Sequence, residues 1–278
     1  MCMERNINKG HCLVCGVEVM GGAGFRRYIR GRGLRVLCVE HASGLMGYHR
    51  SEDLRADSIG TEKKTILAAT SVGVEIETDA DSRYDETYLR FRGTLERVVF
   101  VFESDCTVNT GEAPSPKMFG LATISAILRN NQDCLYMLDT PRTGAHTHVG
   151  IDDMEYLRRY YHSIFVPFSD WLASHSDAWL IENFGSTFRG YARRINASSD
   201  VWEHSNVVNM QHDHTIEFRL SRIAGYKQYM RVIKFWREVG CFINHYDFEK
   251  SADAATRKAA AKSAGLEIVG IATRYFGD

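Results

Sequence analysis

The sequence predicts an α+β protein in which helices cover one face of a curved antiparallel sheet, behind a small metal-binding module. Three features predict it: segments with apolar residues at every second position, long helical segments in the second half, and paired cysteine and histidine residues near the start. A chain of 278 residues with 44% hydrophobic content is long enough for one large domain and a small appendage. We therefore expect a metal-binding module over residues 1–55 and a main domain over residues 56–278.

Composition narrows the class of protein. The formal net charge of −1 argues against a nucleic-acid coat or a membrane-surface protein. The sequence lacks an apolar run of the roughly 18 residues that a membrane helix needs, and residues 1–10 are too polar for a secretion signal, so we expect a cytoplasmic protein. Seven cysteines, an odd number, favour reduced thiols over a disulfide framework.

The first segment has the spacing of a zinc site. Cys12 and Cys15 form one pair, Cys38 and His41 form another, and 22 residues separate the pairs. Two residues between the members of a pair suit a tetrahedral ion, so we expect a structural Zn²⁺ in a zinc-ribbon or treble-clef-like module, with hairpin strands at 25–29 and 34–39. The alternative is a set of ordinary buried cysteines and a surface histidine.

The same module is basic. Residues 1–50 hold eight Lys or Arg residues against three acids. This surplus suits contact with nucleic acid or an acidic macromolecular partner, and a solvated arginine face is the alternative.

After a polar stretch over residues 51–64, the sequence predicts these elements in order. Strands are expected where apolar residues alternate, and helices where they recur every three or four positions. The segments are a strand at 72–77, a strand at 97–105, a helix at 117–130, a strand at 145–150, a helix at 153–175, a hairpin of 207–210 with 215–220 across 211–214, and helices at 225–246 and 252–264.

Polar residues share one face of each predicted strand. In the first strand, Glu75 and Glu77 alternate with Val72, Val74 and Ile76. Strands whose apolar faces share a core bring their other faces together, and gathered carboxylates repel one another unless cations neutralise them. A mainly oxygen-rich set favours Mg²⁺ or Mn²⁺. The candidate ligands are Glu75, Glu77, Asp105, Glu112, His146 and Glu217.

Four motifs in this order resemble those of the amidoligase family, relatives of glutamine synthetase and γ-glutamylcysteine ligase. They are Gly73-Val-Glu-Ile-Glu77, Glu103-Ser-Asp-Cys-Thr-Val continuing to Glu112-Ala-Pro-Ser-Pro116, Ala145-His-Thr-His-Val-Gly150 and Thr215-Ile-Glu-Phe-Arg219. The resemblance spans residues 73–222. It implies the sheet of the glutamine synthetase and guanidino kinase fold.

The resemblance also implies two metal ions that bridge the phosphates of ATP. One ion would be held by Glu77, Asp105 and Glu112, and the other by Glu75, His146 and Glu217. His148 would lie near the nucleotide, and Arg219 would face the γ-phosphate. The segment from Phe188 to Arg193 resembles the family's Arg-x-Tyr-x-Lys segment, which implies that Arg189, Tyr191 and Arg193 line the phosphate or substrate side.

The expected activity is ATP-dependent joining of a carboxylate to an amine through an acyl phosphate, with Arg219 and Arg189 at the phosphates and Glu103 as a proton acceptor. The two substrates stay unidentified. A phosphotransferase on the same fold, a two-metal hydrolase and a non-enzymatic zinc-ribbon adaptor are the alternatives. His212 and His214 are expected to be solvated loop residues.

Overall fold

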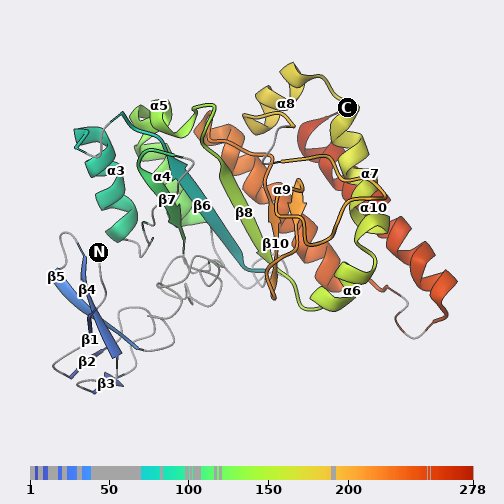
Figure 1. The fold of residues 1–278 in the computed structure, drawn as a ribbon, viewed down its shortest axis with the longest axis horizontal. Coiled ribbons are helices and arrows are strands. Elements are labelled where there is room, and N and C mark those ends of the chain that lie inside the picture. The colour runs from blue at the N-terminus through green and yellow to red at the C-terminus, as the bar shows by residue number, and fades with distance from the viewer. Residues whose placement is uncertain are drawn as a thin grey trace. The chain divides into compact units, whose positions relative to one another are not determined.

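The computed structural model describes residues 4–5, 9–11, 18–20, 24–29, 33–38, 70–81, 84–97, 100, 102, 108–115, 118, 121–188, 192–248, 250 and 252–277. The chain divides into two compact units, 1–64 with 71–143 and 65–70 with 144–278. Both units contain antiparallel strands, and most of the described helical residues belong to the second unit. The protein is therefore of the mixed α+β class (Figure 1).

The first described strands form two small antiparallel sheets. β4 Gly24–Ile29 lies between β1 Glu4–Arg5 and β5 Gly33–Cys38, while β2 Gly10–His11 pairs with β3 Glu18–Val19. The β4–β5 hairpin is the one that the sequence predicts. Cys12, Cys15 and His41 lie outside the described residues, as does the predicted boundary at residue 55, and of Cys38 only the backbone is described.

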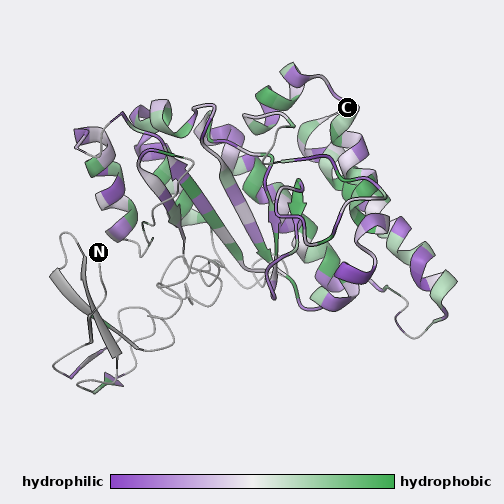
Figure 2. Cartoon of the chain, in the orientation of Figure 1, coloured by the Kyte–Doolittle hydropathy of each residue, from purple (hydrophilic) through white to green (hydrophobic). Residues whose placement is uncertain are grey.

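The rest of the first unit is built on the pair of β6 Val72–Thr78 and β7 Gly111–Pro114. Figure 2 shows hydrophobic and hydrophilic residues alternating along β6, although every residue of that strand is buried. α3 Glu86–Arg97, α4 Ala122–Asn130, the 3-10 helix η2 Gln132–Cys134 and α5 Leu135–Leu138 complete the described elements of this unit.

Two sequence predictions in this unit need correction. The strand expected from Arg97 is wrong at its start, because Arg97 ends α3, and neither Phe100 nor Phe102 lies in a strand. The ring of Phe102 packs edge-on against Tyr88 of α3 at 6.1 Å, so the apolar alternation serves a helix contact. The helix expected from residue 117 begins only at Ala122, since Met118 exchanges backbone hydrogen bonds with Val72.

The second unit contributes three antiparallel strands, in the order β8, β10, β9, to a sheet of five strands. β8 Ala145–Gly150 has the predicted bounds, and β10 Thr215–Phe218 and β9 Val208–Asn209 form the predicted hairpin in shorter form. In the β8–β10 register Glu217 stands opposite His148 and Phe218 opposite Thr147. Residues 217 and 148 therefore point to one face of the sheet, and residues 218 and 147 to the other.

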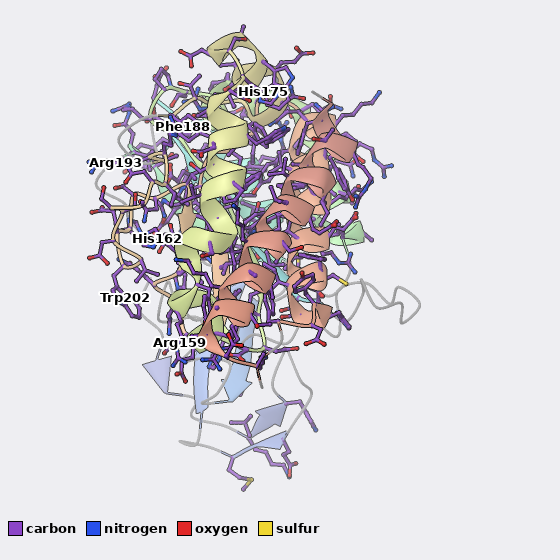
Figure 3. The ribbon with its side chains drawn as sticks, turned by 90° about the vertical axis from the view of Figure 1, so that its right-hand side faces the viewer. Arg159, His162, His175, Phe188, Arg193 and Trp202 are labelled. Carbon is purple, nitrogen blue, oxygen red and sulfur yellow. The ribbon has the colours of Figure 1, made fainter. Side chains whose placement is uncertain are left out.

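The described part of this unit has five helices: α6 Met154–Arg159, α7 Tyr161–Ala173, α8 Asp177–Phe184, α9 Tyr226–His245 and α10 Ala254–Phe276. α7 and α10 run side by side in Figure 3. The ring of Phe218 points from the sheet toward α7 and α9. It packs on Phe168 of α7 and on Phe235 and Trp236 of α9, at centroid distances of 6.0, 6.4 and 5.2 Å. This aromatic core fixes the apolar face of β10.

The helix predictions for this unit were incomplete. The single helix expected over 153–175 is two helices, α6 and α7, separated at Tyr160. α10 runs twelve residues beyond the predicted end at Ala264, because Ile268, Ile271 and Phe276 continue its buried face. α9 matches its prediction, with Gly225 and Tyr246 as the flanking caps. Among the described helices, none has the length and apolar character needed to cross a membrane.

Candidate functional site

The polar face of the β8–β10 pair carries a buried cluster of ionisable side chains. Glu217 is fully buried, and His146, His148 and Arg219 are each at most 7% exposed. The register explains the grouping, because His148 is directly opposite Glu217 and His146 is two residues along the same face. Alternation with the core-facing Phe218 and Thr147 therefore gathers these polar groups on one side.

The Glu217 carboxylate has a different set of partners at each oxygen. Oε1 accepts a hydrogen bond from Nη1 of Arg219 at 2.5 Å and lies 3.1 Å from Nδ1 of His146. Oε2 accepts from Nδ2 of Asn209 at 2.7 Å and lies 3.7 Å from Nε2 of His212. One buried carboxylate thus contacts a guanidinium, an amide and two imidazoles.

These partners determine the charge of Glu217. Burial by itself raises the pKa of the carboxyl, but the Arg219 guanidinium and the imidazoles of His146 and His212 outweigh that effect and hold the pKa well below its usual range. Glu217 is therefore an ionised carboxylate at neutral pH. An ionised carboxylate beside several imidazoles is a donor set for a divalent cation.

His212 belongs to this cluster, which corrects the expectation of a solvated loop residue. It is 6% exposed, and its ring meets that of His148 edge-on with centroids 5.0 Å apart. Ligand atoms of His148, His212 and Glu217 all lie within 4.8 Å of one another. His214, two residues later in the same loop, is exposed as expected.

Arg158 of α6 fixes the loop that carries His212. Its Nε and Nη2 donate to the carbonyl of Met210 at 3.2 and 3.1 Å, and Nη2 also donates to the carbonyl of His212 at 2.6 Å. The guanidinium lies 4.6 Å from the ring centroid of Trp202. The backbone on both sides of Gln211 is thereby held to a helix, and His212 is kept on the polar face.

In the first unit, the β6–β7 pair carries carboxylates. Glu77 stands directly opposite Glu112, and Glu75 is two residues along the same face of β6. Glu75 and Glu77 are 1% and 8% exposed, and Glu112 is half-buried. This pair of strands therefore offers oxygen ligands, in contrast to the imidazole-rich set on β8 and β10.

The structure brings together some of the residues in each of the two predicted sets of metal ligands. Glu77 and Glu112 of the first set are cross-strand neighbours, while Asp105 and also Glu103 lie outside the described residues. His146 and Glu217 of the second set are in contact at 3.1 Å. Glu75 belongs to the first unit, and its sharing of an ion with the other two stays a prediction.

The residues expected beside the nucleotide are partly buried, partly exposed and partly outside the described residues. Arg219 is buried against Glu217, and His148 is buried against His212. Arg193 is exposed, lies at the edge of the view in Figure 3, and pairs through its backbone with Ser205 and Val207. Arg189 and Tyr191 lie outside the described residues.

Sequence reasoning missed three residues that shape the site: Asn209, His212 and Arg158. The hairpin prediction contained a signal for Asn209, since the residue opposite a candidate ligand in a neighbouring strand contacts it. His212 lies in the hairpin loop, where alternation gives no direction. The contact of Arg158 with that loop joins residues 52 and 54 positions apart, so no local pattern reveals it.

The sequence was compared with models of protein families and with curated proteins. No family model matches it, and neither does any curated protein. Function is therefore inferred from the residues and contacts of the chain itself.

Proposed function

We propose that the protein is an ATP-dependent carboxylate–amine ligase of the amidoligase type. The observation that carries the proposal is the buried contact of Glu217 with Arg219 and His146, which brings together residues from two of the four family-like motifs. Such a grouping suits a site for metal-bound phosphate. The carboxylate and the imidazole can bind a metal ion, and the guanidinium can donate hydrogen bonds to phosphate oxygens. The glutamine synthetase type of sheet is part of this proposal.

The donor set fits divalent cations. Glu77 and Glu112 stand directly opposite each other and offer carboxylate oxygens, the ligand type that Mg²⁺ and Mn²⁺ prefer. With Asp105 they would hold one Mg²⁺ or Mn²⁺, while Glu75, His146 and Glu217 would hold the other. Bound there, the ions would offset negative charge on phosphate oxygens.

Arg219 would bind the γ-phosphoryl group of ATP. In the described state its Nη1 contacts Glu217 and lies 3.3 Å from Nε2 of His204. A guanidinium can donate to several acceptors at once, so it can hold Glu217 and a phosphate oxygen together. Its low exposure strengthens that interaction, because little water competes.

The proposed reaction has two steps. A carboxylate oxygen of the first substrate attacks the γ-phosphorus in line, the bond to the β-phosphate oxygen breaks, and ADP and an acyl phosphate form. The amine of the second substrate then attacks the acyl carbon, phosphate leaves with the bonding electrons, and an amide remains. The amine nitrogen loses a proton to a base, for which Glu103 is the candidate.

The remaining parts of the proposal concern partners. The substrates are a carboxylate and an amine, and the basic N-terminal module, with Zn²⁺ held by Cys12, Cys15, Cys38 and His41, would contact a macromolecule that carries one of them. We propose action in the cytoplasm, where thiols stay reduced and ATP is abundant.

A second candidate function is a metal-dependent hydrolase. The imidazoles of His148 and His212 beside the Glu217 carboxylate favour it, because two histidines with one carboxylate are a donor set of hydrolytic zinc enzymes. Such an enzyme would need no ATP. Dependence of the reaction on ATP therefore distinguishes the two candidate functions.

ATP turnover tests the ligase directly. The full-length protein is incubated with ATP, Mg²⁺ or Mn²⁺, pooled amino acids and pooled amines, and ADP is measured. We expect ADP only when a carboxylate and an amine are both present, and its loss in Arg219→Lys, which keeps the charge but not the planar fork. Exposed His214→Gln serves as the control and should turn over normally. If no pool of substrates gives an ATP-dependent reaction, the ligase proposal is contradicted and the hydrolase is the remaining candidate.

A further inference from the structure

We infer that His148, His212 and Glu217 form a transition-metal site. The site uses a histidine from the hairpin loop and lies wholly in the second unit. It differs from the two cation positions proposed above in using His148 and His212, and it shares the Glu217 carboxylate with the second of them. The inference does not depend on the ligase activity.

The geometry of the three side chains carries the inference. Their ligand atoms lie within 4.8 Å of one another, and His212 Nε2 lies 3.7 Å from Glu217 Oε2. Atoms bound to one zinc-sized ion at about 2.0–2.2 Å are about 3–3.5 Å apart, so small side-chain rotations bring the set to bonding distance. All three residues are buried, which limits competition from water.

Outer contacts hold two of the three ligands in position. Asn209 donates to the Glu217 oxygen that faces His212, and Arg158 donates to the backbone carbonyl of His212. Hydrogen bonds to the residues that ligate a metal typically fix their orientation and contribute to metal affinity. The other oxygen of Glu217 is held by Arg219, so the carboxylate is fixed from both ends.

The donor types determine the class of metal. Two imidazoles and one carboxylate suit Zn²⁺, Co²⁺, Fe²⁺ or Ni²⁺, whereas Mg²⁺ selects oxygen ligands and keeps several waters. Three protein ligands also leave at least one coordination position for water or an oxygen of a bound anion. The geometry therefore points to a borderline transition metal with an open position.

Cobalt titration of the metal-free full-length protein tests the site. Co²⁺ bound to nitrogen and oxygen ligands absorbs in the visible range, and ligation by the N-terminal cysteines adds a thiolate charge-transfer band in the near ultraviolet, so the two classes of site are read separately. The variants are His212→Gln and His148→Gln. His214→Gln, in the same loop but exposed, is the matched control.

We expect Co²⁺ to bind without the thiolate band in the wild type and in His214→Gln, and the affinity of this binding to be lower by at least about tenfold in the two ligand variants. Thermal melts of the metal-free variants establish that they fold. Wild-type affinity in folded His212→Gln, or Co²⁺ bound only with the thiolate band, overturns the site. If the protein turns over no ATP in any assay but binds cobalt as expected, the ligase proposal is contradicted and the metal site is supported.

Discussion

Glu217 of β10 and Arg219, the first residue after that strand, form a buried ion pair in which Nη1 of Arg219 lies 2.5 Å from Oε1 of Glu217. The side chains are 5% and 0% exposed. Residues two apart in a strand share a face, so the alternation that points Phe218 into the core brings these charges together on the other side. The pair supplies an ionised carboxylate and an oriented guanidinium at one place.

Removing one partner of this pair should cost stability. Glu217→Gln leaves the Arg219 charge buried, and we expect a loss of about 3–5 kcal/mol in the free energy of unfolding, measured by urea denaturation. The exposed pair of Arg194 and Asp170 is the control, since Asp170→Asn should cost no more than about 1 kcal/mol. Equal losses in the two variants would show that burial of the Glu217 pair has no energetic consequence.

The low pKa of Glu217 gives a pH dependence of defined sign. Its usual value is 4.5 and the folded value lies well below that, so the folded state releases this proton more readily than the unfolded state. The contribution to stability is complete above about pH 4.5 and falls by up to about 1.4 kcal/mol per pH unit as the pH drops toward the folded pKa.

Urea denaturation of wild type and Glu217→Gln between pH 3 and 6 measures this dependence, and the difference between the two proteins removes the effect of other carboxyls. We expect the difference to shrink as the pH falls below 4.5. A difference that stays constant over the whole range would contradict an ionised, stabilised Glu217.

Arg158→Lys should loosen the loop that carries His212. A lysine keeps the charge but cannot donate to the carbonyls of Met210 and His212 in the same planar geometry, so we expect a loss of about 1–3 kcal/mol and faster amide exchange over residues 210–214. The neighbouring Arg159→Lys is the control, because Arg159 is exposed and pairs with Glu155 of its own helix. Identical exchange in the two variants would remove the positioning role of Arg158.

Two glycines of α10 should respond to alanine in opposite directions. A Cβ on Gly265 would lie 2.6 Å from the Ile164 carbonyl oxygen of α7, while one on Gly270 would meet nothing within 4 Å. We expect Gly265→Ala to destabilise the protein by about 1–3 kcal/mol through overpacking, and Gly270→Ala to stabilise it by about 0.5–1 kcal/mol. Thermal unfolding of both variants checks the contrast, and stabilisation by both would mean that α7 and α10 do not approach closely at Gly265.

The sequence predicts elements well where one periodicity dominates. Alternation sets the bounds of β8 and places His146 and His148 on one face, and the helical period gives α9. It fails at Arg97, which ends α3, and at Phe100 and Phe102, which lie in no strand, while the ring of Phe102 packs on Tyr88 of α3. Period alone does not distinguish a strand from an extended segment held against a helix.

The candidate site is predictable only as far as the strands are. Glu217, Arg219 and His146 follow from side-chain direction in β10 and β8. His212 does not, because its direction is set by a loop that Arg158 holds through backbone carbonyls far away in the sequence. Hydrogen bonds between residues far apart in the sequence do not appear in its hydrophobic periodicity. The sequence pattern therefore does not distinguish a buried loop histidine from a solvated one.

Transfer of a labelled oxygen tests the proposed reaction most directly. Substrates labelled with ¹⁸O in the carboxylate are incubated with ATP, Mg²⁺ and amines, and the released phosphate is analysed by mass spectrometry. Attack of the carboxylate on the γ-phosphorus puts one ¹⁸O into the phosphate, and we expect this product from the wild type and His214→Gln but not from Arg219→Lys. Phosphate without label from the active wild-type protein would contradict an acyl phosphate and with it the ligase.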